Sequence, residues 1–318
     1  MRSSSVDPQP PSRVEAYAPG SVGNVGPGLD ILGLAVAGLG DTVTGERRAV
    51  AGIVVEDPGH PDLPTEPSRH AAAIAAEAVF RRLGLERQGL VLRVRKGLPL
   101  AGGQGGSAAS AAAGAGAANA LLGSPLTRRD LVEAAMEAET VVAGRHADNV
   151  APAVLGGLVL VRALEPLDLV CLPVPDGLHV VLVRPDMALR TALGRAALPA
   201  WVSREIALHQ AAQVAAIVAA AYSGDLALLG RAIDDRIAEP ARAPLLPGFL
   251  EAKRAALAEG ALGCSISGSG PSAFAFTDDL TRADRIGQAM KEAYRRSGLG
   301  CEVRITEPDR EGLRVRAV

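Results

Sequence analysis

The feature that most constrains this chain is the stretch GGQGGSAAS at residues 102–110, which lies between a strand-like run and an alanine-rich segment. Gly103, Gly105 and Gly106 give the backbone freedom, and the alanines that follow favour a helix. A glycine loop that leads into a helix presents free N–H groups at the helix N-terminus, where the helix dipole also favours an anion. The stretch therefore predicts a phosphate loop, with a close-packing turn as the alternative.

Two familiar phosphate motifs do not fit this loop. A dinucleotide fingerprint follows its strand directly and has an acidic residue about 20 positions later, at the end of the next strand. Here Pro99 and other loop residues intervene, and the next acidic residue, Asp130, begins a predicted helix. A Walker A loop needs a lysine directly after its glycines, and this loop has none.

Composition narrows the class of protein. A chain of 318 residues with a net charge of −2 and no basic cluster is typical of a globular protein of about two domains, without nucleic-acid binding. The longest apolar segment, 211–222, is shorter than the roughly 20 residues that cross a bilayer, so we expect no membrane contact. Cys171, Cys264 and Cys301 are few and far apart and form no CxxC motif, which predicts reduced thiols in a cytoplasmic protein. Residues 1–12 lack the apolar core of a signal peptide and are expected to form a disordered tail.

Strand-like and helical segments mix without the strict alternation of a doubly wound sheet, so we predict an α+β fold. Strands are expected at 14–18, 32–43, 52–57, 90–97, 156–164, 178–184, 262–267, 272–277 and 301–306. Helices are expected at 68–84, 107–122, 128–143, 202–222, 225–238, 248–259 and 281–297, the third with Thr127 as its N-cap. Three prolines between 165 and 178 suggest a domain border, which divides the chain into 13–165 and 166–318.

Two more glycine-bearing segments follow predicted strands, GSVGNVGPGLD at 20–30 and GCSISGSGPSAF at 263–274. Together with GLPLAGGQGGSAAS they strongly resemble the three motifs of the GHMP small-molecule kinases. In that family the middle motif reads P-x-x-x-G-L-G-S-S-A-A and wraps the ATP phosphates, while S-G-x-G-P supports the loop and the substrate. The resemblance implies a two-domain α+β architecture with an ATP site between a glycine-rich loop and a helix N-terminus. It assigns to ATP the residues Pro99, Leu100, Ala101, Gly102, Gly103, Gln104, Gly105, Gly106, Ser107, Ala108 and Ala109.

Four motifs resemble the homoserine kinase branch of this family. They are APGSVGNVGPGLD (18–30), HADNVAPAVLGG (146–157), RTALGRAALP (190–199) and DDRIAEPARAPLLPGF (234–249). The resemblance implies an ATP-dependent transfer of phosphate to the hydroxyl of L-homoserine, on the route to threonine. It also implies a possible homodimer, because relatives are often dimers.

The resemblance also implies roles for residues around a zwitterionic substrate. Arg195 and Arg242 would bind the carboxylate, for which the planar guanidinium is suited. Asp30 and Asn24 would hold the ammonium group, and Asn149 would orient the reacting hydroxyl. Each arginine has the alternative of a solvated surface residue, the usual case in a chain this rich in arginine.

The phosphate side is expected to use Mg²⁺, which takes one or two protein oxygens besides the phosphates. The resemblance places Ser107 and Glu139 as its ligands, with Glu137 as a nearby rival. His146 is expected to orient the loop that carries Asn149. No general base is evident, so Asn149, Ser107 and Glu139 would act by alignment and charge neutralisation, which phosphoryl transfer mainly requires.

One departure concerns the phosphate loop itself. Where the family has G-L-G-S-S, this chain has Gly103-Gln104-Gly105-Gly106-Ser107, and one serine hydroxyl is lost. A hydrogen bond to a charged group contributes about 1.5–3 kcal/mol. We therefore expect weakened activity. Two alternatives stay open: a GHMP kinase for another small alcohol, and a nucleotide- or amino-acid-binding sensor on the same fold.

Overall fold

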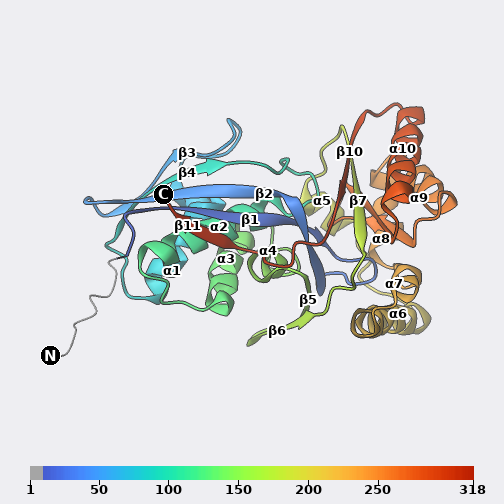
Figure 1. The fold of residues 1–318 in the computed structure, drawn as a ribbon, viewed down its shortest axis with the longest axis horizontal. Helices are drawn as coiled ribbons and strands as arrows, with labels where there is room; N and C mark the ends of the chain where they lie inside the picture. The colour runs from blue at the N-terminus through green and yellow to red at the C-terminus, as the bar shows by residue number, and fades with distance from the viewer. Residues whose placement is uncertain (1–9) are drawn as a thin grey trace.

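The computed structural model describes residues 10–318. Most of the expected N-terminal tail, residues 1–9, lies outside the described residues. The chain forms an α+β fold built on two sheets, as the sequence predicts (Figure 1). The strands of the described residues are β1 (Arg13–Gly23), β2 (Leu32–Arg48), β3 (Gly52–Asp57), β4 (Gly89–Arg95), β5 (Leu158–Leu164), β6 (Leu167–Leu172), β7 (His179–Pro185), β8 (Gly263–Ile266), β9 (Ala273–Thr277), β10 (Cys301–Thr306) and β11 (Arg314–Ala317).

The helices follow the expected order, with several short ones added. They are α1 (Ala71–Arg82), α2 (Gly106–Leu121), α3 (Arg128–Val142), α4 (Val150–Leu155), α5 (Thr191–Ala196), α6 (Arg204–Ser223), α7 (Leu226–Arg231), α8 (Ala238–Arg242), α9 (Phe249–Ala258) and α10 (Leu280–Arg296), with short 3₁₀ turns at Pro67–Arg69 and Ala243–Leu245. Thr127 caps α3 as predicted, in a capping box with Asp130.

The first sheet has seven strands in the order β11-β1-β2-β4-β3, and β5 joins β2 to β6. Helices α1, α2 and α3 cover one of its faces (Figure 1). The central helix α2 is buried on nearly all sides, because it consists almost entirely of alanine and glycine. A side chain at Gly114 would collide with the backbone of Ala72, so α1 and α2 pack closely only because this residue is glycine. This packing fixes the direction of α2 and therefore the place of the phosphate loop at its start.

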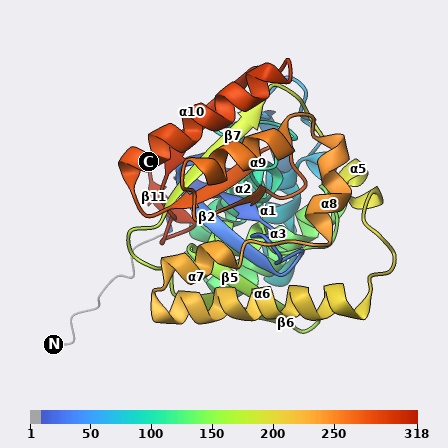
Figure 2. The same cartoon turned by 90° about the vertical axis from the view of Figure 1, so that its right-hand side faces the viewer.

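The second sheet has the order β10-β7-β9-β8, and α9 and α10 pack against it (Figure 2). The loop between β8 and β9 carries the C-terminal glycine motif, and it faces the phosphate loop from the other sheet. The two lobes therefore meet where all three glycine segments lie.

The domain border expected at 165 cuts through a hairpin of the first sheet. Strand β6 pairs antiparallel with β5 across it, and β11 at the end of the chain returns to pair with β1. The proline-rich stretch that follows residue 165 contains the turn of this hairpin and strand β6. The chain therefore leaves the first sheet only after Leu172 and enters the second sheet at β7. The expected helix at 225–238 is also divided, because the Asp235 carboxylate accepts three backbone N–H groups and starts α8.

Helix α6 matches the helix expected at 202–222 and contains the apolar segment 211–222. By length and composition it is the one helix of residues 10–318 that qualifies as a membrane span, and 22% of its apolar window is buried. In Figure 2 it runs along the lower edge of the molecule, next to α7.

Candidate active site

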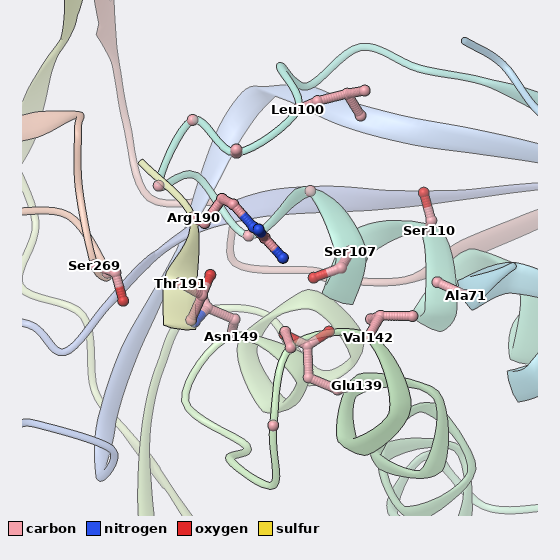
Figure 3. Close-up of a pocket in the computed structure, with 18 of the residues that line it drawn as sticks. Ala71, Leu100, Ser107, Ser110, Glu139, Val142, Asn149, Arg190, Thr191 and Ser269 are labelled. Atoms are coloured by element: carbon pink, nitrogen blue, oxygen red, sulfur yellow. The ribbon is translucent and has the colours of Figure 1, made fainter. Parts of the chain in front are cut away.

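A cavity of about 490 Å³ lies between the two lobes, a size usual for sites that bind small molecules. Its wall combines the phosphate loop, the loop between β1 and β2, the end of α3, the start of α4, the segment around α5 and the loop between β8 and β9. Figure 3 shows labelled side chains from the phosphate loop, α2, α3, the start of α4, the segment around α5 and the loop between β8 and β9 around one space. Six segments, several of them far apart in the sequence, thus form a single site.

The phosphate loop has the geometry of an anion site. Gly103 and Gly105 adopt φ of +72° and +71°, where glycine is strongly favoured. Helix α2 begins at Gly106 with no side chain capping its first turn, so its N–H groups are available to a ligand. Most of the residues assigned to ATP line the cavity: Pro99, Leu100, Ala101, Gly102, Gly103, Gly105, Gly106 and Ser107.

Gln104, Ala108 and Ala109 do not line the cavity. The alanines are buried in α2, and the Gln104 side chain points into the contact between the lobes, where its Nε2 donates to Ser272 Oγ at 3.0 Å. Ser272 and Ser267 in turn donate to the carbonyl oxygens of Gly102 and Gly103, both at 2.6 Å. The second lobe therefore holds the phosphate loop in place, and Gln104 contributes to that contact.

Ser107 at the start of α2 and Glu139 near the end of α3 lie side by side, as the metal assignment requires (Figure 3). Glu139 is buried, and its Oε2 has no hydrogen-bond partner in the structure. Burial raises the pKa of Glu139 to about 7, against the opposing effects of the Ser107 hydroxyl and of His146. A buried carboxylate with an unpaired oxygen is an unfavourable arrangement that a cation would relieve. The rival Glu137 instead pairs with Arg81 and Arg82 away from the cavity.

His146 and Asp148 form a buried pair beside Glu139. His146 Nδ1 lies 3.7 Å from Asp148 Oδ1, and both atoms lack a hydrogen-bond partner. Burial raises the pKa of Asp148, while the charge of His146 opposes the rise. Sequence reasoning did not select Asp148, although it precedes Asn149 in HADNV. The neighbouring asparagine had a more evident role. Only the structure shows that Asp148 is buried with one carboxylate oxygen, Oδ1, lacking a partner, while Oδ2 accepts the Asn24 N–H.

Asp30 and Arg195 meet across the mouth of the cavity. The two guanidinium N–H groups donate to the two carboxylate oxygens at 3.0 and 2.7 Å. Burial alone would raise the pKa of Asp30, but Arg195 outweighs it and holds that pKa below its usual range. The structure thus brings together, from opposite lobes, the two charges that a zwitterionic amino acid would need.

Asn149 and Asn24 also line the cavity. Asn149 immediately precedes α4 and accepts a hydrogen bond from Ser21 Oγ at 2.9 Å. The Asn24 amide is already engaged, since it donates to the Gly268 carbonyl at 3.0 Å and accepts the Asp30 N–H at 2.9 Å. Asn24 therefore holds the loop that carries Asp30, and its assigned contact with an ammonium group stays a prediction.

Arg242 lies in the wall behind the cavity, almost wholly buried. Its guanidinium donates to the carbonyl oxygens of Gly194 and Gly268 at 3.1 and 2.9 Å. Burial and the charge of Arg195 lower its pKa. Its assigned contact with a carboxylate stays a prediction, whereas its contacts in the structure tie α5 to the loop between β8 and β9.

Lys96 is a second residue that sequence reasoning did not select. Its ammonium group pairs with the buried Asp41 and donates to the Gly106 carbonyl and to Ser110 Oγ, at 2.9 and 3.1 Å. The chain has only three lysines, and this one precedes the phosphate loop by a few residues. A lysine directly before the phosphate loop, in RKGLPL, could have been recognised from the sequence as a residue of the site. Its ion pair could not, because Asp41 lies far away in the sequence.

Comparison with known proteins decides the family. Residues 70–157 match the model of the GHMP kinases N terminal domain, and residues 217–296 match the GHMP kinases C terminal model. A homoserine kinase of Chloroherpeton thalassium is 42% identical over 95% of this chain and 99% of its own length. A homoserine kinase of Arabidopsis thaliana is 45% identical over 92% of this chain and 82% of its own length. The chain belongs to the homoserine kinase family of the GHMP kinases.

A solved homoserine kinase from Cytophaga hutchinsonii shares this fold. Its crystal structure superposes with a TM-score of 0.92 at 38% identity, over 99% of this chain and 100% of that one. The fold expected from the glycine motifs, a two-lobed GHMP kinase of the homoserine kinase family, is therefore confirmed. Membership of the family also makes the chain an ATP-dependent kinase.

Proposed function

We propose that this chain transfers the γ-phosphoryl group of ATP to the side-chain hydroxyl of L-homoserine, giving ADP and O-phospho-L-homoserine on the route to threonine. The observation that carries the proposal is that one cavity joins a phosphate loop to a paired carboxylate and guanidinium, Asp30 and Arg195. A substrate with both charged groups can replace this one ion pair by two, because its ammonium group can pair with Asp30 and its carboxylate with Arg195. An uncharged alcohol would leave the pair unchanged and gain nothing from it.

Asn149 is placed to orient the hydroxyl. It lines the cavity between the phosphate loop and Asp30, and Ser21 fixes the direction of its amide. An amide cannot accept the hydroxyl proton as a base, so alignment of the hydroxyl with the phosphoryl group is its contribution. In-line transfer through a loose transition state needs mainly this alignment and neutralisation of charge, and the proton leaves to phosphate or water.

Ser107 and Glu139 fit the Mg²⁺ that accompanies ATP. They offer one hydroxyl and one carboxylate with an unpaired oxygen, and Mg²⁺ commonly takes one or two protein ligands and fills its remaining positions with phosphate and water. No group of three or more His, Cys, Asp and Glu side chains in residues 10–318 could form a metal cage of protein ligands alone. The ion would neutralise charge on the phosphates.

The outer part of the cavity is suited to the base of ATP. It is lined by apolar side chains of the segment before α1, of the first residue of α1 and of the end of α3: Leu63, Pro64, Ala71, Val141 and Val142. A flat heterocycle can be buried between such side chains. The sequence gave no signal for this pocket, because no aromatic residue marks it.

The experiment that tests the proposal measures ADP release from Mg-ATP with homoserine, threonine, serine, mevalonate or shikimate as acceptor. We expect turnover with homoserine well above the other four. Turnover with an uncharged or singly charged alcohol at a similar rate would contradict the role of the Asp30–Arg195 pair. ATP or homoserine binding without turnover on any acceptor would favour a sensor.

We further propose a cytoplasmic homodimer. Cys171, Cys264 and Cys301 are free thiols in the structure, as suits a reducing compartment. Helix α6 exposes an apolar face, and strand β6 next to it is an edge strand of its sheet that pairs with β5 only. An unpaired edge beside an apolar helix is a self-complementary surface that a second copy can cover about a twofold axis.

A further inference from the structure

Arg190 is a cation in the cavity that none of the motif assignments uses. It is the residue immediately before α5, on the second lobe, and its side chain lines the cavity. Figure 3 shows its guanidinium reaching across the space toward Ser107 and the start of α2, above Asn149 and Glu139. It therefore extends from the lobe that holds the amino-acid site toward the loop that receives the phosphates.

The other cations near the centre of the cavity already have partners. Arg195 is bound to Asp30, and Lys96 is bound to Asp41. Arg242 lies behind the cavity wall and donates to two carbonyl oxygens, while its buried Nη2 has no partner. The Arg190 guanidinium has no ion pair and no hydrogen bond to any group within residues 10–318, and only its backbone carbonyl is engaged, by Leu193 and Gly194. An unpaired guanidinium that points into a site for a triphosphate is available to that ligand.

The phosphate loop of this chain increases the need for such a cation. Its backbone donors are neutral, it carries no lysine, and Gly106 stands where the family motif has a serine hydroxyl. The ionisable groups on the wall formed by the end of α3 and the start of α4 include two carboxylates, Glu139 and Asp148, and one imidazole, His146. A triphosphate placed here would therefore depend on added positive charge from the second lobe.

We propose that Arg190 is a further catalytic residue, which binds the γ-phosphoryl group of ATP and stabilises the charge on it during transfer. This inference rests on the proposed function. In the transfer, the bond between the γ-phosphorus and the β–γ bridging oxygen breaks, and the homoserine oxygen forms a bond to the same phosphorus. The hydroxyl proton leaves to phosphate or water, and ADP takes the electron pair of the broken bond. A guanidinium on the equatorial oxygens assists without any change in its own protonation.

The test replaces Arg190 by Ala and by Lys and measures kcat and both KM values. We expect Arg190→Ala to lower kcat by about 100-fold, as for loss of one preorganised donor, with the KM for homoserine within about threefold of wild type. Arg190→Lys keeps the charge but loses the forked geometry, so it should recover part of the loss. Added millimolar guanidinium chloride should partly restore Arg190→Ala, which a purely structural role would not allow.

The matched control is Arg204→Ala, an exposed arginine shortly after α5 and outside the cavity. It should keep the wild-type kcat and show no response to guanidinium. A kcat for Arg190→Ala within twofold of wild type would overturn the inference, as would a loss that neither lysine nor guanidinium relieves.

A second measurement separates this inference from the proposed function, because it needs no acceptor. Wild type should bind a non-hydrolysable ATP analogue more tightly than ADP, and Arg190→Ala should lose this preference. An inactive wild type with homoserine would contradict the proposed function. The ratio of the two affinities, for the ATP analogue and for ADP, would still test the role of Arg190. An unchanged ratio in that case would overturn the inference.

Discussion

Glu139 is a carboxylate in surroundings that favour its protonated form. Burial raises its pKa from 4.5 to about 7, so ionising it costs free energy in the folded chain that it does not cost in the unfolded one. Because the folded pKa lies above the unfolded value, the stability contributed by this group is complete below pH 4.5. It is lost as the pH rises through 7.

We therefore expect Glu139→Gln to stabilise the ligand-free protein at pH 8, by about 2–3 kcal/mol from a shift of this size. The gain should shrink to below about 1 kcal/mol at pH 5, and chemical unfolding of both proteins at the two pH values measures it. A stability difference that does not change between pH 5 and 8 would contradict the raised pKa. In kinetic assays the same variant should lose most of its response to Mg²⁺.

Arg195 tests the amino-acid end of the site. Arg195→Ala removes the guanidinium partner of Asp30, and truncating one member of a charge pair costs about 2–5 kcal/mol in binding. The pair is partly exposed, so we expect the lower end of this range and a KM for homoserine about 30-fold higher. The KM for ATP should stay within about threefold of wild type. An unchanged KM for homoserine would remove Arg195 from the substrate site.

The phosphate loop is the element in which this chain departs most from its family. The second lobe holds it through Ser267, Ser272 and Gln104, so the backbone donors are positioned despite three glycines in four residues. A Cβ added at Gly106 would meet Pro99 O at 3.3 Å and Lys96 Nζ at 3.5 Å. A serine can therefore be accommodated there with only slight adjustment.

We expect Gly106→Ser, which restores the family residue, to leave kcat unchanged and to raise kcat/KM for ATP by about 10-fold, the lower end of the value of one added hydrogen bond to a charged group. Steady-state kinetics with varied ATP measures this. Gly105→Ser is the contrasting variant, because a side chain there would collide with Ser21 Oγ and the residue has φ of +71°. It should lose activity. A loss with Gly106→Ser as well would mean that the loop is aligned incorrectly with the family motif.

At the scale of the whole molecule, the exposed face of α6 stands out as an apolar surface within residues 10–318. Trp201, just before the helix, is 90% exposed, and Leu208 and Tyr222 are each 65% exposed. The segment 206–224 contains no Asp, Glu, Lys or Arg. Contiguous apolar surface of this kind marks an interaction site.

We expect a dimer by light scattering coupled to size-exclusion chromatography, and a monomer for Leu208→Arg, because a charge at a covered apolar face costs its desolvation. Leu257→Arg, on an exposed position of α9, is the matched control and should keep the wild-type mass. A monomeric wild type would contradict the proposal, and so would a Leu208→Arg variant that stays dimeric.

The sequence by itself determined the elements and the place of the phosphate loop. Alternation, alanine-rich helical runs and glycine punctuation are local signals, so nearly all long helices and strands were predicted within a few residues. The short helices α4 and α5, the edge strand β6 and the returning strand β11 were missed, because a few residues carry too little pattern and their partners lie far along the chain. The family motifs likewise identified Asp30, Arg195, Ser107, Glu139 and Asn149 as a set.

Only the tertiary structure decided what each of these groups experiences. Whether a carboxylate is paired with arginine, as Asp30 is, or buried with a free oxygen, as Glu139 is, depends on atoms brought from other segments by packing. The same reason explains why Asp148 and Lys96 escaped notice and why Arg242 lies behind the cavity wall. Burial and charge proximity are properties of the folded chain as a whole, and no local stretch of sequence encodes them.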